Sequence, residues 1–268
     1  MREEAGIYLA MIVASIRAKM EYKASFLFLF VALLVFYLAQ VGVIVVVLTK
    51  FGDIAGWSLG EMAFLYGLMV FSQGITTILF GSLNDFESQI IAGDFDRLLV
   101  RPLSPLMQIL ASNFEISSIA HFFIGSTALY YGSVGAGVEW TWQKAAYLPV
   151  VMTGAVLIQG GIRLSVAAVC FWTIRNRSLV HIVVYSSKEM ILYPITIYHW
   201  GMQLFLTLLL PLAFINFYPS HFFLARSGSN LLFHPFIQYL SPLVGVTLFA
   251  GAYALWRLGV SRYQSAGN

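Results

Sequence analysis

Long apolar runs constrain this chain more than any other feature of its sequence. Residues 25–48 contain no charged side chain, and about 20 apolar residues in a row are enough to cross a bilayer as a helix. Apolar residues make up 59% of the chain and charged residues 10%, whereas soluble domains have about 45–50% and about 25%. A soluble domain cannot cover that much apolar surface, so the sequence predicts an all-α polytopic membrane protein.

Six apolar runs are long enough to serve as transmembrane helices of a single domain that covers residues 1–268. The predicted spans are residues 25–48, 59–83, 106–131, 145–172, 190–215 and 241–258. Residues 1–24 precede the first span, and their apolar stretch, residues 7–16, is too short to cross a membrane. Because charged residues flank this stretch, we expect an N-terminal amphipathic helix that lies in the membrane interface.

The distribution of basic residues predicts the orientation of the chain. Six crossings place both termini on one side of the membrane, and Lys and Arg are enriched in cytoplasmic loops. If the termini are cytoplasmic, eleven basic residues lie inside and three lie outside. The inner ones are Arg2, Arg17, Lys19, Lys23, Arg97, Arg101, Arg175, Arg177, Lys188, Arg257 and Arg262, and the outer ones are Lys50, Lys144 and Arg226. Both termini are therefore predicted to be cytoplasmic.

One strongly polar segment, residues 84–105, separates the second predicted span from the third. Its six charged residues are Asp85, Glu87, Asp94, Asp96, Arg97 and Arg101. A charged residue at the bilayer centre costs about 2.5–3.5 kcal/mol, so this segment must lie in water at the cytoplasmic face. Two interpretations remain open at this point, namely a solvated loop between spans and a short helix on which another protein docks.

A polar layer is predicted at the middle of the membrane, formed by Gln73, Glu115, Arg163 and His199. Glu115 and Arg163 lie nine or ten residues from the cytoplasmic ends of their spans, which at about 1.5 Å per residue places them roughly 14–15 Å deep. Because an isolated buried charge is costly, we expect Glu115 and Arg163 to pair across adjacent helices. The layer either clamps the bundle or lines a cavity that contacts a substrate, and both roles stay open.

The external segment, residues 216–240, is too apolar for a free loop and too short for two crossings. We expect it to fold back into the outer leaflet as re-entrant helices, which requires that its backbone be buried in protein. The alternative is an aromatic belt at the membrane interface.

Signals for catalysis and cofactor binding are missing from the sequence. The chain has one cysteine, Cys170, and no Cys–His spacing typical of a metal site. It has no Gly-x-x-x-x-Gly-Lys loop for nucleotide phosphates, and its net charge of +3 is too small to indicate nucleic acid binding. We therefore expect no catalytic residue, metal or cofactor on this chain, and we expect membrane lipids but no nucleic acid among its partners.

Three segments of the chain resemble one family when they are taken together. They are GDFDRLLVRPLSP at residues 93–105, Tyr193-Pro194 followed by PLAFINFYP at residues 211–219, and WRLGVSRYQSA at residues 256–266. Their order and their positions relative to the six spans resemble the ABC-2 class of ABC transporter permeases, in particular its six-span bacterial branch. The resemblance extends over essentially the whole chain.

The resemblance implies that this chain is the membrane subunit of an ATP-driven exporter in a bacterial plasma (inner) membrane. Cytoplasmic ABC ATPase subunits would bind ATP and Mg²⁺ and hydrolyse the ATP. A second permease, identical or homologous, would complete the transport pathway. Alternating access would then move an amphipathic or lipid-like cargo outward, such as a drug, a peptide or a lipid-linked molecule.

The resemblance also implies roles for individual segments. Residues 84–105 correspond to the coupling segment that docks on the ATPase, and the N-terminal helix corresponds to a connecting helix. The implied ATPase-coupling residues are Asp85, Phe86, Glu87, Phe95, Asp96 and Arg97, and the implied external gate residues are Tyr218, Pro219, Phe222 and Phe223. We expect an aromatic anchor, Phe86 or Phe95, to fill a cleft of the ATPase.

Three other functions stay open on the sequence alone. An ion-coupled secondary transporter would use Glu115, Arg163 and His199 as a proton relay, although no repeat between the two halves indicates such a transporter. An integral membrane enzyme would need a close catalytic grouping, which the sequence does not offer. A non-transporting membrane anchor for an ATPase cannot be separated from an exporter by its sequence.

Overall fold

The computed structural model describes residues 2–21, 23–112, 115, 118–226 and 232–264. No β-strand occurs in these residues, which confirms the all-helical prediction. The elements in chain order are α1 (Arg2–Met20), α2 (Lys23–Phe51), α3 (Leu59–Phe80), η1 (Gly81–Asp85), α4 (Phe86–Ile91), α5 (Asp94–Leu99), α6 (Pro105–Ser112), α7 (Ile119–Gly135), α8 (Trp142–Thr173), α9 (Arg177–Leu179), η3 (Val180–Ser186), α10 (Ser187–Glu189), η4 (Ile195–Ile197), α11 (Trp200–Leu204), η5 (Phe205–Leu209), η6 (Leu212–Phe214), α12 (Phe217–Phe223), η7 (Pro235–Tyr239) and α13 (Ser241–Arg262). Of these, η3 and η5 are π-helices and the other η elements are 3₁₀-helices.

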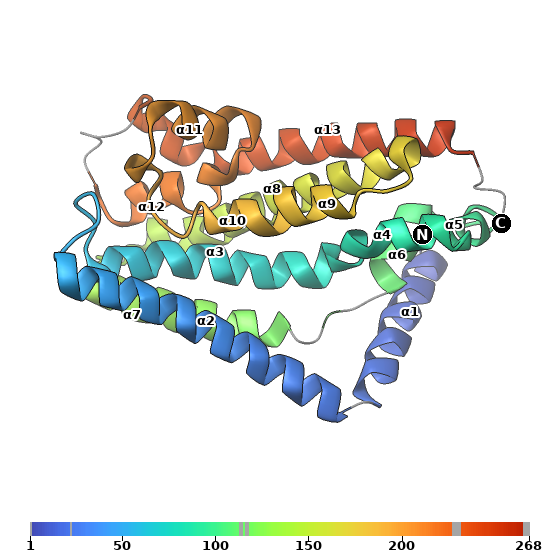
Figure 1. Ribbon diagram of the computed structural model, residues 1–268, viewed down its shortest axis with the longest axis horizontal. Helices are drawn as coiled ribbons and strands as arrows, with labels where there is room; N and C mark the ends of the chain where they lie inside the picture. Colours follow the sequence, from blue (N-terminus) through green and yellow to red (C-terminus); the bar gives the residue numbers. More distant parts are fainter. Residues whose placement is uncertain (1, 22, 113–114, 116–117, 227–231, 265–268) are drawn as a thin grey trace.

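The helices form an elongated bundle with two distinct ends (Figure 1). The short helices α4, α5 and α6 gather at one end, where α13 also finishes. At the opposite end lie α11, α12 and the loop between α2 and α3. Helix α1 packs against α6 and meets the first residues of α2 at an angle. The predicted coupling segment and the predicted external segment thus occupy opposite ends of the molecule.

Four helices, α2, α3, α8 and α13, are long and apolar enough to cross a membrane. A fifth crossing results if residues 200–209 and 212–223, which meet at 77°, count as one bent span. The part of the chain that the structure describes therefore contains four or five candidate spans, and the six crossings stay a prediction. The predicted spans that correspond to single long helices are 25–48, 59–83, 145–172 and 241–258.

The two remaining predicted spans are interrupted. The third, residues 106–131, is divided into α6 and α7. The fifth, residues 190–215, is broken into short α-, π- and 3₁₀-helices, so its prediction as one continuous helix is wrong. Pro194 and Pro211 lie at two of the breaks, because proline lacks a backbone N–H and its ring clashes with the preceding helical turn.

Residues 173–189 lie between the fourth and fifth predicted spans, and most of them are helical. Here α9, η3 and α10 follow one another without a gap, and η3 packs on α8, because residues 178–186 are mostly apolar. Lys188 is half-buried in this stretch, and its position on the cytoplasmic side stays a prediction. The count of eleven inner basic residues against three outer ones would be ten against three without it, so the predicted orientation does not depend on Lys188.

The predicted helix at the N-terminus is confirmed as α1. Its charged residues lie near its two ends, and residues 6–18 between them form a short apolar stretch. Apolar and polar side chains are therefore distributed along α1 more than around it, and the two-faced pattern expected of an amphipathic helix is weak.

Glycines allow the long helices to pack at close range. A Cβ atom added at Gly67 of α3 would lie 2.6 Å from the backbone nitrogen of Leu129, and one added at Gly132 of α7 would lie 2.3 Å from the backbone nitrogen of Phe64. On α8, a Cβ atom added at Gly154 would lie 2.8 Å from backbone atoms at the start of α13. Small residues at these positions let the helix backbones come close together. Close contact increases van der Waals packing, which stabilises helix pairs in a membrane, where the hydrophobic effect does not drive their association.

We expect Gly132→Ala to lower the free energy of unfolding by about 1–3 kcal/mol, because the added methyl group overpacks against α3. Gly42→Ala on α2 is the matched control, since no atom lies within 4 Å of its added Cβ position. Thermal unfolding of both variants in one detergent measures the difference. Equal stability of the two variants would contradict the close packing of α3 and α7.

Candidate functional site

An aromatic cluster holds the predicted coupling segment to the bundle. Phe86 of α4 and Phe95 of α5 are fully buried, with ring centroids 5.4 Å apart. Phe86 also lies 5.0 Å from Trp256 of α13 and 5.3 Å from Phe171 of α8, and Phe95 lies 5.0 Å from Tyr263. The prediction that Phe86 or Phe95 fills a cleft of a partner is wrong, because both rings are buried in the core of this chain.

Gly93 makes this arrangement possible by separating α4 from α5. Its φ of +69° is left-handed, a conformation that glycine adopts without strain. Phe86 and Phe95 are nine positions apart, and at about 3.6 residues per turn they would lie on opposite faces of one continuous helix. The break lets both rings reach the same cluster.

Glu87 of α4 binds backbone N–H groups at the start of the helical stretch 177–189, which begins at the same end of the molecule. Its Oε2 accepts hydrogen bonds from the backbone N–H groups of Asn176 and Arg177, each at 2.5 Å. These N–H groups begin the helical stretch 177–189 and have no partner within it, and a carboxylate is also favoured there by the helix dipole. Glu87, which was predicted to contact an ATPase, thus joins α4 to the helix that carries Lys188.

The exposed surface of the coupling segment combines charged and apolar residues. Asp85 and Arg97 are exposed, and Asp96 is half-buried. Arg97 lies 3.5 Å from Asp94 in an exposed ion pair, and such pairs contribute little to stability. The apolar residues exposed beside them are Ile91, Leu99 and Val100. Three of the predicted coupling residues, Asp85, Asp96 and Arg97, therefore lie on this surface.

The predicted polar layer is partly assembled. Gln73 and Arg163 are buried and share one acceptor, because Gln73 Nε2 donates to Thr77 Oγ1 at 3.2 Å and Arg163 Nη2 donates to the same oxygen at 3.4 Å. Glu115 is half-buried between α6 and α7, beside Gly81, and it interacts electrostatically with Arg163. A direct Glu115–Arg163 pair stays a prediction.

His199 lies outside this layer, which corrects its predicted position. It is exposed at the start of α11, where its Nδ1 accepts a hydrogen bond from the backbone N–H of Gly201 at 3.3 Å. The predicted depth assumed a continuous fifth span, and the breaks in that span remove the assumption. A proton relay through Glu115, Arg163 and His199 therefore loses its third member.

A small cavity lies beside Arg163. Its volume is about 20 Å³, and it lies between α3, α8 and the stretch from η3 to α10. Arg163, Gln73 and Gln159 line it together with Lys188, which the sequence analysis did not place in the layer. The mostly apolar composition of residues 178–186 is the sequence signal that favours a buried helix there.

The predicted gate residues lie together on α12 and comprise Tyr218, Pro219, Phe222 and Phe223. Three are buried, and Phe222 is half-buried. The Tyr218 hydroxyl forms a hydrogen bond of 2.8 Å with Thr207 Oγ1, and the Phe223 ring lies 5.6 Å from that of Phe64 on α3. This segment is thus buried in protein, as a re-entrant helix requires, and its role as a gate stays a prediction.

Arg226, just after α12, ties this end of the bundle to the loop between α2 and α3. Its Nη1 lies 2.7 Å from Glu61 Oε1, in an ion pair whose side chains are 24% and 19% exposed. Its Nη2 donates to the backbone oxygen of Gly56 at 2.9 Å, and its guanidinium lies 4.2 Å from the centroid of the Trp57 ring. Arg226 therefore contacts Gly56, Trp57 and Glu61 at the same time.

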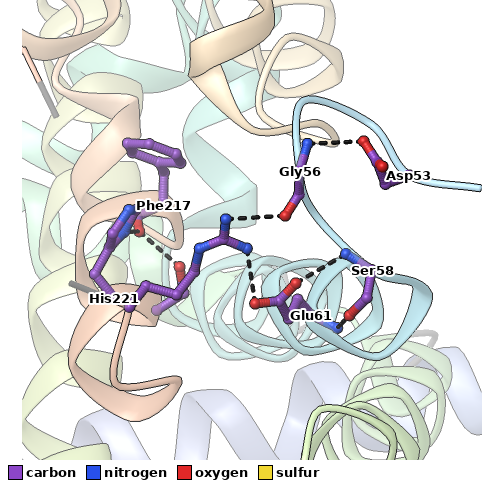
Figure 2. A network of polar contacts seen from close by, with 8 residues as sticks. Asp53, Gly56, Ser58, Glu61, Phe217 and His221 are labelled. Atoms are coloured by element: carbon purple, nitrogen blue, oxygen red, sulfur yellow. Dashed lines mark hydrogen bonds and ion pairs between the residues drawn. The ribbon is translucent and has the colours of Figure 1, made fainter. Parts of the chain in front are cut away.

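Glu61 is the second centre of this network (Figure 2). Its Oε2 accepts the backbone N–H of Ser58 at 2.8 Å, and Ser58 Oγ accepts the backbone N–H of Glu61 at 3.4 Å. These two bonds form a capping box at the start of α3. Asp53 Oδ1 accepts the backbone N–H of Gly56 at 2.9 Å. The sequence analysis missed this network, although Ser58 followed by Glu61 three residues later is a readable helix-start signal.

Metal binding has no support in the described part of the chain, where no three His, Cys, Asp or Glu side chains lie close enough together to hold an ion. The charged residues discussed above belong to three separate sets within the described residues. They are the exposed coupling surface, the cavity beside Arg163 and the network around Arg226.

We expect Arg226→Gln and Glu61→Gln each to lower the free energy of unfolding by about 1–3 kcal/mol, because each removes a charged hydrogen bond in a partly buried setting. The double variant should cost less than the sum of the two, since both changes remove the same contact. Thermal unfolding followed by tryptophan fluorescence measures these values. Lys50→Gln, an exposed residue at the end of α2, is the control, and strict additivity would contradict the coupling.

Phe86→Ala and Phe95→Ala should each lower the free energy of unfolding by about 3–5 kcal/mol, because each leaves a cavity in the aromatic cluster. Asp85→Ala and Arg97→Ala, which change exposed residues on the same segment, should stay within about 0.5 kcal/mol of wild type. Membrane expression and thermal unfolding of the four variants test this. A Phe95→Ala variant as stable as wild type would restore the idea that this ring contacts a partner.

A comparison with protein families finds one matching description. The family model described as an ABC-2 family transporter protein matches residues 33–267. The match covers the coupling segment, the cavity beside Arg163, α12 and the network around Arg226. No curated protein and no solved structure matches the chain.

Proposed function

Because the chain belongs to the ABC-2 family of transporter proteins, we propose that it is the permease subunit of an ATP-driven exporter. The family match over residues 33–267 carries this proposal. Membrane components of this family generally work with ABC ATPases. On this proposal, ATP and Mg²⁺ are bound and ATP is hydrolysed by cytoplasmic partner subunits, and this chain itself is not an enzyme.

The ATPase docks on the exposed surface of α4 and α5. This surface offers charged groups, Asp85 and Arg97, beside exposed apolar side chains such as Val100, which is 84% exposed. Such a mixture of apolar and charged groups suits a protein interface. Phe86 and Phe95, on the buried side of this segment, pack against α8 and α13. A movement of the docked ATPase would therefore be transmitted to the membrane helices through packed side chains.

The orientation follows from the two ends of the bundle. Both α1 and α13 have a terminus at the end that carries α4, α5 and α6 (Figure 1), and the basic residues favour that end as the cytoplasmic one. We place the protein in the inner membrane of a bacterium with both termini in the cytoplasm. A second permease, identical or homologous, completes the pathway, and the helices around α12 close it on the outside.

The cargo is amphipathic or lipid-like. A cavity of about 280 Å³ lies between α2, α3 and α7, and apolar side chains line it, including Leu38, Ile44 and Ile124. A cavity of this kind accommodates a hydrocarbon chain better than a polar solute. ATP binding closes the ATPase subunits, pushes the coupling segments and opens the external end, so that the cargo leaves by alternating access.

Co-purification from the native membrane, followed by an ATPase assay, tests the proposed partner. We expect an ATPase to co-purify with wild type, and we expect Arg97→Glu and Val100→Asp to reduce its recovery at least about tenfold, as the loss of about 1.4 kcal/mol or more of binding free energy would do. Both residues are exposed, so the variants should fold.

Lys50→Glu reverses a charge at the opposite end of the bundle and is the matched control, which should retain the ATPase. Absence of any ATPase in several mild detergents would reject the exporter. Recovery of the ATPase by both variants at the wild-type level would reject only the docking surface.

A further inference from the structure

Arg163 has a buried donor that finds no hydrogen-bond acceptor among the described residues. Its side chain is 2% exposed, and its Nη2 donates to Thr77 Oγ1. Its Nη1 is buried and has no hydrogen-bond partner within the described residues. A guanidinium presents its N–H donors in a planar fork that matches the oxygens of a carboxylate or a phosphate. Nη1 is therefore available to an acceptor that the described part of the chain does not supply.

Lys188 brings a second positive charge to the same cavity. It lines the cavity from the helical stretch 177–189, opposite Arg163 on α8. The carboxylate next to it, Glu189, is not part of the lining and accepts a hydrogen bond from Gln40 of α2 at 3.0 Å. Glu115 also interacts with Arg163 from outside the lining. The described residues that line the cavity thus include two cations and no carboxylate.

The other polar side chains of the lining are uncharged and make hydrogen bonds within the chain. Gln159 Nε2 donates to Ser72 Oγ at 2.9 Å, and Gln73 Nε2 donates to Thr77 Oγ1 at 3.2 Å. The Ser187 hydroxyl donates to the backbone oxygen of Val183. The remaining lining is apolar and includes Ile162 and Leu212. Among the described lining residues, the charged ones are therefore the two cations, Arg163 and Lys188.

The volume of about 20 Å³ limits what the cavity admits in this conformation. It exceeds the roughly 10–15 Å³ that one water molecule needs, but it cannot hold a large head group. One oxygen atom of a carboxylate or a phosphate fits this space. Entry of the rest of an amphiphile requires the lining residues to move apart, with its hydrocarbon chain against the apolar ones.

The element that carries Lys188 is connected to the coupling segment at two points. Asn84 Nδ2 donates to the Tyr185 hydroxyl at 3.1 Å, and Glu87 binds the first N–H groups of the same helical stretch. Part of that stretch, η3, is a π-helix, a conformation found frequently at functional sites. A displacement of the coupling segment would therefore reposition Lys188 relative to Arg163.

We propose that the cavity between Arg163 and Lys188 binds the anionic group of the cargo, so that this permease exports anionic amphiphiles. The inference rests on the proposed export function and narrows its substrate class. Arg163 contacts the anionic group directly through Nη1, and Lys188 adds charge that the coupling segment can move toward or away from it.

Amphiphiles of equal chain length and opposite charge test whether the cavity prefers an anion. The experiment uses the full-length wild-type chain in a neutral detergent. Octyl phosphate and octanoate should raise the unfolding temperature in a saturable way, and octylamine, which has the same chain length and the opposite charge, should not. Sodium phosphate and sodium chloride form the inorganic arms and should have much weaker effects. Equal stabilisation by octylamine, or binding of the inorganic anions alone, would overturn the proposal.

Substitutions at Arg163 and Lys188 test whether these residues bind the anionic group. Arg163→Gln and Lys188→Gln should each weaken octyl phosphate binding about tenfold or more, since each removes a charge-assisted contact, and Arg163→Lys should retain part of the affinity. Arg257→Gln, an exposed residue on α13, removes the same charge elsewhere and is the control. If Arg163→Gln does not fold, Lys188→Gln carries this comparison. Wild-type affinity in Lys188→Gln and in every folded Arg163 variant would overturn the proposal.

ATPase measurements separate this inference from the export function on which it rests. With the co-purified ATPase, octyl phosphate should stimulate hydrolysis by wild type and not by Lys188→Gln. An active ATPase complex that neither binds nor responds to anionic amphiphiles would overturn the substrate class and leave the exporter in place. Absence of an ATPase partner would reject the exporter, whereas binding to the isolated chain would still report on the cavity.

Discussion

The burial of α8 is the constraint on which the rest of the bundle depends. Within its apolar window 78% of the residues are buried inside the molecule, against 17% for α2 and 22% for α13. Helices α3 and α13 pack on it, and glycines such as Gly154 let their backbones approach closely. A helix surrounded by protein on most sides can carry polar side chains, because partners from neighbouring helices replace the water that lipid cannot supply. Arg163 is tolerated inside the bundle for that reason.

The same helix contacts both ends of the molecule. Near its start, Lys144 Nζ donates to the backbone oxygen of Phe223 on α12 at 2.8 Å. Near its end, Phe171 packs in the aromatic cluster beneath the coupling segment. The 32 residues of α8 span about 48 Å at about 1.5 Å per residue. One rigid element therefore touches the predicted gate, the cavity and the predicted coupling segment, which is the arrangement that a transport cycle needs.

Much of the fold could be predicted from the sequence, but much less of the candidate site could. The spans that became α2, α3, α8 and α13 were predictable because apolar length is a property of a segment by itself. The direction in which Phe86 and Phe95 point was not, because an aromatic residue in a polar segment can face a partner or its own core. Gly93 decides between them only once α8 and α13 are in place. The predicted depth of His199 is wrong for a related reason. That depth was counted along one continuous helix, and Pro194 and Pro211 interrupt the helix.

The sequence by itself determined that this is a helical membrane protein, because hydropathy is a property of each segment by itself. The distribution of basic residues along the chain predicts which end of the molecule faces the cytoplasm. It also carried the family resemblance, which the match over residues 33–267 confirms. Only the tertiary structure decided which polar groups meet. Arg226 and Glu61 are 165 residues apart, and Lys188 reaches the cavity beside Arg163 from a segment between two predicted spans. Such contacts depend on how helices pack around α8, and no local pattern of residues encodes that packing.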